Sequence, residues 1–283
     1  MRESLHTIQR DMIMLGNQIP LFILDRLLEL SKPDMKGHVA NLALEFFSPM
    51  EPTGDPQTKL SSNSLELAPL SDHGRLHCLE VFRLSLLGSS PKPKPREQNW
   101  RLKTPQQLIH SVTELREAGI RFRKSEKDGL WDIKFKGGTL WIPRLLIHDG
   151  TRSLFLNLMA FEQSHIDCSN DITSYVIFMD NLINSAEDVG YLHKCGIIEH
   201  WLGSNAEVAD LFNRLCKEVV FDINSSYLSI LSEEVNRHYK RRWNAWRASL
   251  KHKYFSNPWS IISFIAALVL LARFLISHVV EIV

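Results

Sequence analysis

The chain has 283 residues, of which 44% are hydrophobic and 23% charged, and its formal net charge is +1 at pH 7. These values are ordinary for a folded protein and exclude a chain too short or too polar to bury a core. A net charge this close to zero points to no class of partner, so partners must be inferred from local features.

The chain begins with a helical pattern. Apolar residues recur at helical spacing, but Arg10 and Asp11 interrupt any continuous apolar run, so the start does not resemble a secretory signal. The pattern predicts two helices, at 3–15 and 20–30, within an N-terminal helical segment of residues 1–48.

Proline marks the next stretch. Eight of the twelve prolines fall between Pro49 and Pro105, so residues 49–105 are interpreted as Pro/Ser-rich connections. The sequence LHCLEVFRLSLL at 76–87 predicts one short helix inside them. Thr104-Pro105-Gln106-Gln107 then has the composition of a helix N-terminus with a capping box.

The hydrophobic period changes within the α-rich body of residues 106–256. Trp131, Ile133 and Phe135 alternate with polar residues, and Gly137-Gly138 follows them. Alternation on both sides of a Gly-Gly pair predicts an antiparallel β-hairpin at 131–142. Residues 120–123 are expected to add a third strand.

The remainder of the body is helical by its spacing of apolar residues. Helices are expected at 151–163, 172–185, 187–195 and 205–220, the last capped by Ser204-x-x-Glu207, and a long helix at about 228–254. The predicted fold class is therefore mostly α with a small antiparallel β-hairpin element and a single C-terminal transmembrane helix.

That transmembrane helix is predicted within residues 257–283. Between 259 and 277, fifteen of nineteen residues are apolar, and about 20 such residues cross a bilayer as a helix. The alternative is a buried core helix. The residues assigned to the membrane anchor are Trp259, Ile261, Phe264, Leu268, Leu271 and Arg273.

A basic stretch precedes the anchor and contains no Asp or Glu between 237 and 253. Such a cluster predicts a cytoplasmic body beside anionic lipid, a bilayer as partner and a location compatible with the plasma membrane. Nucleic acid is the disfavoured alternative for this stretch. Its juxtamembrane basic residues are Arg237, Lys240, Arg241, Arg242, Arg247, Lys251 and Lys253.

No catalytic residue, metal ligand or cofactor site is assigned. Asp149-Gly150-Thr151 resembles part of an aspartyl phosphotransferase motif, but Ile147 replaces the nucleophile, which favours a turn that caps the following helix. His73, His77 and Cys78 lack a second cluster that would complete a metal site.

Several blocks of the sequence resemble a known family. They are MLGNQIP (14–20), FFSPM (46–50), TELREAGIRF (113–122), DIKFKGGTLWIP (132–143), NLMAFEQ (157–163), ITSYVIFMDNLINSAEDVGYLHKCGII (172–198), EVADLFNRL (207–215) and YFSNPW (254–259). The chain is thereby identified as resembling the plant-specific domain-of-unknown-function 247 family, also called uncharacterised protein family 0481.

The resemblance implies a largely helical plant protein with a C-terminal membrane helix and no known enzymatic activity. Some members are associated with pollen recognition in grass self-incompatibility. The resemblance also implies that the family's N-terminal portion, upstream of the MLGNQIP block, is missing from this chain.

The resulting hypothesis is a membrane-anchored plant protein that binds an unknown protein partner without catalysis, cofactor or nucleic acid. One alternative is a cryptic membrane-tethered hydrolase that uses paired carboxylates such as Glu162 and Asp180. Another is a truncated, non-functional family copy. A deep pocket with converging titratable groups would favour the enzyme, and an exposed apolar patch would favour the binding protein.

Overall fold

The structure is a computed structural model of the whole chain. It describes residues 2–35, 37–52, 76–87, 108–125, 129, 131–165, 168–217, 219, 221–255, 266, 269–270 and 273. These divide into two units, Met1–Asn236 and Arg237–Val283, which are considered separately below.

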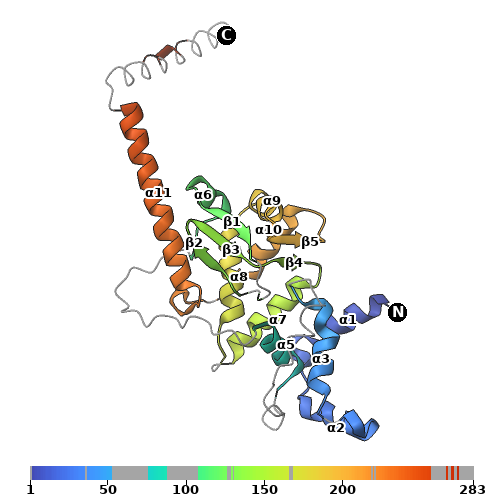
Figure 1. Cartoon of the computed structure of the whole chain (residues 1–283). Coiled ribbons are helices and arrows are strands. Elements are labelled where there is room, and N and C mark those ends of the chain that lie inside the picture. Colours follow the sequence, from blue (N-terminus) through green and yellow to red (C-terminus); the bar gives the residue numbers. More distant parts are fainter. Residues whose placement is uncertain are drawn as a thin grey trace, which may run out of the picture. The chain divides into compact units, whose positions relative to one another are not determined.

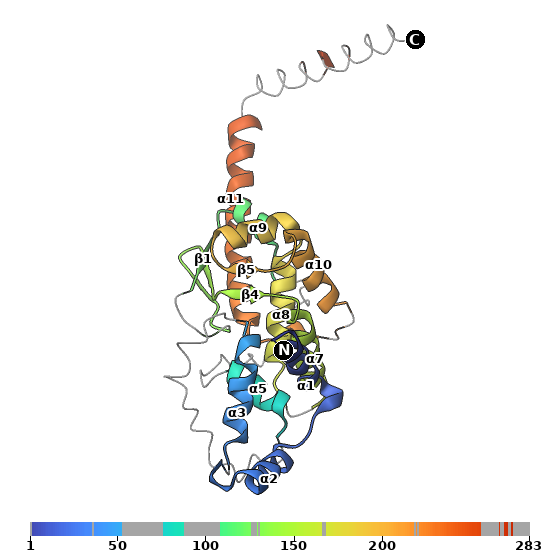
Figure 2. The ribbon, with the colours of Figure 1, turned by 90° about the vertical axis from the view of Figure 1, so that its right-hand side faces the viewer.

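The first unit begins with four described helices, of which α3 and α5 contact each other through the aromatic pair Phe47 and Phe82, whose ring centroids are 5.6 Å apart. The expected helices at 3–15, 20–30 and 76–87 are present with small shifts of their ends, whereas α3 was not predicted. The bounds are α1 Arg2–Met12, α2 Leu21–Ser31, α3 Val39–Phe47 and α5 Cys78–Leu87, with the 3-10 turns η1 Leu15–Asn17, η2 Pro33–Met35 and η3 Ser48–Met50. Figure 1 and Figure 2 place α2 at the edge of this unit, beyond α3 and α5.

The hairpin is confirmed. Strands β2 (Lys134–Lys136) and β3 (Thr139–Ile142) pair antiparallel, and Gly137 and Gly138 turn between them with φ of +59° and +72°. Glycine adopts such positive φ values without strain, because it has no Cβ. Strand β1 (Arg121–Lys124) confirms the third strand, but it pairs parallel with β3, which therefore lies in the centre of the sheet.

A second sheet was not predicted. Strands β4 (Leu145–Ile147) and β5 (Ile198–His200) pair in parallel, so the strand content is mixed and not limited to an antiparallel hairpin. Three-residue strands give too little alternation for sequence reasoning to detect. Their connection is the helical core of the unit, because α7, α8 and α9 all lie between them in the chain.

The helical core surrounds α8, which buries eight of its twelve residues. Its Tyr175 is fully buried and contacts the ring of Trp131 edge-on, with centroids 5.0 Å apart. The expected helices of the body are confirmed, although α10 ends earlier than predicted. The bounds are α6 Val112–Glu117, α7 Thr151–Ser164, α8 Asp171–Leu182, α9 Ala186–Lys194, α10 Asn205–Leu215, η5 Ile223–Ser225 and α11 Ser229–Phe255.

A buried ion pair connects three of these elements. The Arg83 side chain on α5 donates to Glu162 Oε1 on α7 at 2.9 Å, and the two side chains are 5% and 1% exposed. Glu162 also accepts the backbone N–H groups of Ile172 and Thr173 at the start of α8. The carboxylate thus caps the N-terminus of α8, where the helix dipole favours a negative charge.

The structure contradicts the prediction of a single transmembrane helix. Within the described residues, no helix combines the length and the apolar character that a bilayer crossing requires. The longest helix, α11, has 27 residues but includes the basic stretch 237–253, and charged residues oppose insertion. Of the anchor residues named from the sequence, only Arg273 is described; Trp259, Ile261, Phe264, Leu268 and Leu271 lie outside the described residues.

The buried ion pair generates a stability prediction. Glu162→Gln removes the charge that neutralises Arg83 and should lower the free energy of unfolding by about 3 kcal/mol, because an uncompensated charge then remains buried. Arg26→Met, which breaks an exposed ion pair with Glu29, should cost less than about 1 kcal/mol. Urea unfolding followed by circular dichroism measures both. Equal losses in the two variants would contradict the central role of the Arg83–Glu162 pair.

Candidate functional site

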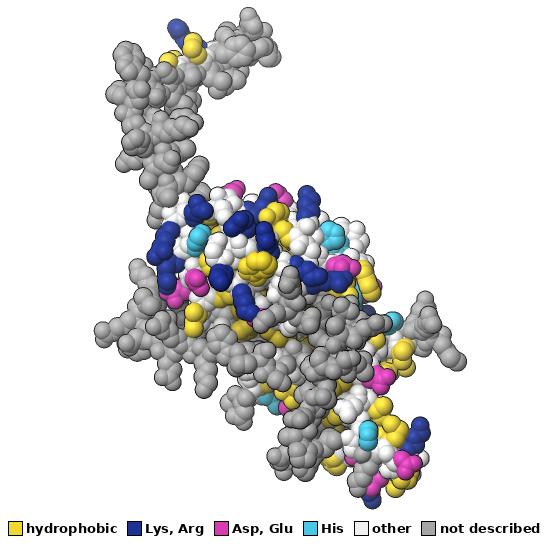
Figure 3. All heavy atoms as spheres, in the orientation of Figure 1, with side chains coloured by type: hydrophobic (Ala, Val, Ile, Leu, Met, Phe, Trp, Pro, Cys, Tyr) yellow, Lys and Arg dark blue, Asp and Glu magenta, His cyan; other side chains and the backbone are white. Residues whose placement is uncertain are grey.

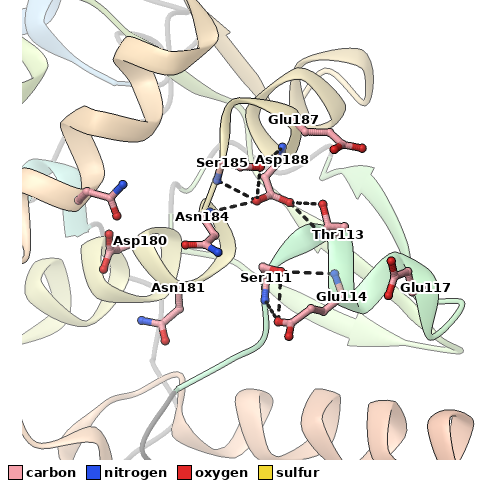
Figure 4. Close-up of a pocket in the computed structure, with 11 residues that line it drawn as sticks. Ser111, Thr113, Glu114, Glu117, Asp180, Asn181, Asn184, Ser185, Glu187 and Asp188 are labelled. Carbon is pink, nitrogen blue, oxygen red and sulfur yellow. Dashed lines mark hydrogen bonds between the residues drawn. The ribbon is translucent and has the colours of Figure 1, made fainter. Parts of the chain in front are cut away.

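The described part of the chain contains a polar pocket between α6, α8, α9 and α10, with a volume of about 590 Å³ (Figure 4). Its described lining consists of five carboxylates, three amides and three hydroxyls, and contains no Lys or Arg. The lining residues are Ser111, Thr113, Glu114, Glu117, Asp180, Asn181, Asn184, Ser185, Glu187, Asp188 and Asn213.

Both carboxylate oxygens of Asp188 accept hydrogen bonds from other residues of the chain. Its Oδ1 accepts the backbone N–H and the hydroxyl of Thr113 at 2.8 and 2.7 Å, and its Oδ2 accepts from Asn184 and Ser185. Figure 4 shows these bonds converging on the carboxylate from both sides. Asp188 therefore fixes the start of α6 against the start of α9, and both oxygens already have several donors.

Glu114 has a comparable local role. It forms a capping box with Ser111, whose backbone N–H donates to Glu114 Oε2 at 3.0 Å. The pattern Ser-x-x-Glu at 111–114 is readable in the sequence, as is Ser-x-x-Asp at 185–188. The cap predicted at 104–107 instead lies outside the described residues. The predicted Ser204-x-x-Glu207 cap of α10 is confirmed.

Asp180 is the carboxylate in the pocket whose properties are most altered. Burial raises its pKa to about 6, while a hydrogen bond from the Cys216 thiol acts in the opposite direction. Among described atoms, its buried Oδ1 has no hydrogen-bond partner. Burial and the neighbouring Asp180 raise the pKa of Cys216, so this thiol stays protonated at neutral pH and is a poor nucleophile.

Glu162 and Asp180 are not brought together. Glu162 binds the first residues of α8, whereas Asp180 lies eight residues after Ile172, near the other end of that helix. At 1.5 Å per residue, the two ends are roughly 12 Å apart. Glu162 is also absent from the described lining of the pocket. The paired-carboxylate arrangement considered from the sequence therefore does not form.

The triplet Asp149-Gly150-Thr151 forms a turn, as expected, and α7 begins at Thr151. Its capping contact differs from the expectation, since no side chain caps the helix. The backbone N–H of His148 donates to Thr151 Oγ1 at 2.9 Å, and the N–H of Gly150 donates to His148 Nδ1 at 3.0 Å. Asp149 thus takes no capping role.

Several histidines gather at the carboxyl ends of β4 and β5. The rings of His193 and His200 are 5.8 Å apart, and His200 Nε2 lies 2.9 Å from Asn205 Oδ1. Burial lowers the pKa of His148, which lies beside the exposed ring of Trp201. No group of three or more metal-ligand side chains occurs among the residues that were described. His73 lies outside those residues, and Cys78 is buried in α5.

The basic stretch 237–253 is helical, as predicted, and forms most of the second half of α11. Arg237, Lys240, Arg241 and Arg242 are exposed. The side chains of Arg247, Lys251 and Lys253 are not described. Their attraction to anionic lipid stays a prediction.

The described residues thus form a mostly helical protein with two small sheets and a polar pocket. A family model described as a plant protein of unknown function, DUF247, matches residues 1–273, and the chain belongs to this family. The resemblance inferred from the sequence blocks is confirmed.

Two relatives from Arabidopsis thaliana carry the name UPF0481. At3g47200 is 32% identical over 93% of this chain and 57% of its own length, and At3g02645 is 30% identical over 58% of this chain and 31% of its own length. The chain therefore spans about half or less of the curated relatives it matches. No solved structure matches the chain.

The raised pKa of Asp180 generates a prediction about stability and pH. The folded state binds a proton at Asp180 more tightly than the unfolded chain, whose carboxyl titrates near 4, so stability should fall as pH rises from about 4 to 6. Asp180→Asn removes this cost. The Tm of the variant minus the Tm of the unmodified protein should therefore be larger at pH 7 than at pH 4.

Asp210→Asn is the matched control, because Asp210 is exposed and pairs with Arg214 on the same helix. Thermal unfolding of the three proteins across this pH range provides the measurement. If the Tm difference between Asp180→Asn and the unmodified chain is constant with pH, the raised pKa of Asp180 is contradicted.

Proposed function

We propose that this chain is a protein-binding module that docks a partner protein through the apolar surface of α2, without catalysis of its own. The observation that supports the proposal is the contrast between the composition of α2 and its burial. A helix that is apolar on most sides is normally enclosed by other elements.

Helix α2 has the sequence LFILDRLLELS, and Leu21 is its one buried residue. Phe22 and Leu27 are 56% and 58% exposed, and Leu30 is 71% exposed. Ile23 on α2 is also exposed, and the segments before and after α2 in the chain expose Leu5, Ile8, Met12, Met14, Ile19 and Leu42. A helix that exposes this many large apolar side chains is typical of an interaction site.

The chemistry of α2 favours an apolar groove on the partner. Ile23, Leu27 and Leu30 follow the spacing of side chains that insert together when a helix binds in a groove. The polar residues of α2 are engaged within the chain: Arg26 pairs with Glu29 at 2.7 Å, and Asp25 accepts the backbone N–H of Gly37 at 2.8 Å. The surface therefore presents apolar contacts and little charge to a partner.

The pocket supports binding over hydrolysis. Asp188 and Glu114 are engaged in capping, and Glu162 is engaged in the buried ion pair. Asp180 is left without a second carboxylate in an acid–base arrangement, and its neighbour Cys216 is a protonated thiol. A hydrolase would need these groups to converge on one reacting atom.

Site-specific photo-crosslinking tests the α2 surface. A photoreactive amino acid at position 27 or 30 should give one discrete adduct in plant extract, while the same residue at position 156, an exposed leucine of α7, should give none. The adduct partner is identified by mass, purified and titrated against the chain by calorimetry. Leu27→Glu/Leu30→Glu should weaken binding about a hundredfold, because two apolar anchors are lost.

The matched control for the titration is Leu156→Glu, which should bind like the unmodified chain. An adduct with the mass of two copies would assign α2 to self-association and overturn the proposal. So would equal crosslinking at positions 27, 30 and 156.

A further inference from the structure

The outer face of the β1–β3–β2 sheet concentrates positive charge. Arg121 and Arg123 alternate with buried Phe122 on β1, and Lys134 and Lys136 alternate with Phe135 on β2. Residues that alternate along a strand share one face of the sheet. All four of these Arg and Lys side chains are exposed, and Figure 3 shows Lys and Arg gathered on the surface over this sheet.

The pairing register orders these charges into two rows. Arg121, Thr139 and Lys136 lie directly across from one another, and Arg123, Trp141 and Lys134 form the next row. Strand spacing makes the Arg and Lys of each row roughly 10 Å apart, and cations on one strand roughly 7 Å apart. The result is a rectangle of four cations around Trp141 and Thr139, which we call the basic sheet face.

The charges of the basic sheet face are only partly neutralised. Lys134 pairs with Asp132 at 2.8 Å. Among the residues that the structure describes, no carboxylate forms an ion pair with Arg121, Arg123 or Lys136. Their separation is close to the Debye length of about 8 Å at physiological salt, so they repel one another, and a bound anion would relieve this repulsion.

An extended acidic protein segment fits this face better than other polyanions. Side chains on one side of an extended segment are roughly 7 Å apart, the same spacing as the two arginines of β1, and each guanidinium can bind a carboxylate with two parallel hydrogen bonds. Trp and Arg together are also the side chains that contribute most at protein interfaces.

Nucleic acid and lipid fit less well. A base would need the face of an aromatic ring for stacking, but Trp141 is half-buried and the Arg123 guanidinium carbon lies 5.6 Å from its ring centroid. A bilayer surface would favour exposed apolar side chains beside the charges. Within the three described strands, the large apolar residues are buried or half-buried.

We propose that the basic sheet face binds an extended acidic segment of a partner protein, with Asp or Glu at alternate positions facing the two arginines of β1. This surface is separate in sequence from α2 and binds independently of it. A failure of either proposal leaves the other intact.

Fluorescence anisotropy with labelled peptides tests this binding. The probe is an alternating Glu-Thr peptide, and its comparison is a peptide of the same composition with the repeat Glu-Glu-Thr-Thr, in which no two carboxylates lie two residues apart on one side of the extended chain. The unmodified chain should bind the alternating peptide more tightly, and affinity should fall as salt is raised. Arg121→Glu/Arg123→Glu should weaken binding about tenfold or more, because two attractive contacts become repulsive.

The control variant Arg214→Glu/Lys217→Glu makes the same change of net charge at two exposed residues near the end of α10, and should alter affinity by less than about twofold. Lys134→Glu/Lys136→Glu on β2 provides a second test should the β1 variant fail to fold. Near-ultraviolet circular dichroism reports folding for each protein.

Equal weakening by the β1 variant and the α10 variant would overturn the proposal, since net charge alone would then explain binding. Equal affinity for the alternating Glu-Thr peptide and the Glu-Glu-Thr-Thr peptide would also overturn it. So would tighter binding to a single-stranded oligothymidine, or to vesicles that contain phosphatidylserine, if Arg121→Glu/Arg123→Glu abolishes that binding.

Discussion

The helical core depends on one buried ion pair, Arg83 with Glu162. Burying a guanidinium and a carboxylate costs free energy that only close pairing and further hydrogen bonds can offset. Both side chains form such further hydrogen bonds. Glu162 accepts two backbone N–H groups and the hydroxyl of Thr173, and Arg83 donates to Ser169. Since these partners lie on α5, on α7 and around the start of α8, the pair specifies how the three helices meet.

Asp188 is a second buried carboxylate that joins two helices through hydrogen bonds. A buried carboxylate accepts from the N-terminal turn of its own helix and from Thr113 on another, so a single side chain joins α9 to α6. Two of the five carboxylates that line the pocket, Asp188 and Glu114, are used in this way, because each accepts hydrogen bonds at a helix N-terminus. A carboxylate that already accepts several hydrogen bonds at a helix end is a poor general base, so these two acidic residues serve the fold.

Sequence patterns predicted the local structure of the chain well and its long-range contacts poorly. Helical spacing located α7 to α11, and Gly137-Gly138 located the hairpin, because each signal is contained within a few residues. The parallel pairing of β4 with β5 joins segments more than fifty residues apart, and no local pattern encodes it. Glu162 and Asp188 are visible as acidic residues, and the Ser185 cap of Asp188 is readable, but their distant partners Arg83 and Thr113 are not.

The two proposed surfaces illustrate the same limit. A run of apolar residues such as LFILDRLLEL has the same pattern whether or not other elements cover it, so the exposure of α2 is information that only the fold supplies. The alternation Arg-Phe-Arg and Lys-Phe-Lys was readable, yet two edge strands of a sheet share a basic face only once β3 is known to lie between them.

The two proposed surfaces would contribute differently to recognition. Apolar contacts such as those of α2 supply affinity with little dependence on orientation, whereas charges such as those of the basic sheet face select partners and speed their encounter. A protein that presents both within one unit can discriminate between partners that share an apolar helix groove. In this chain, selectivity would then arise from acidic segments that only some of those partners carry.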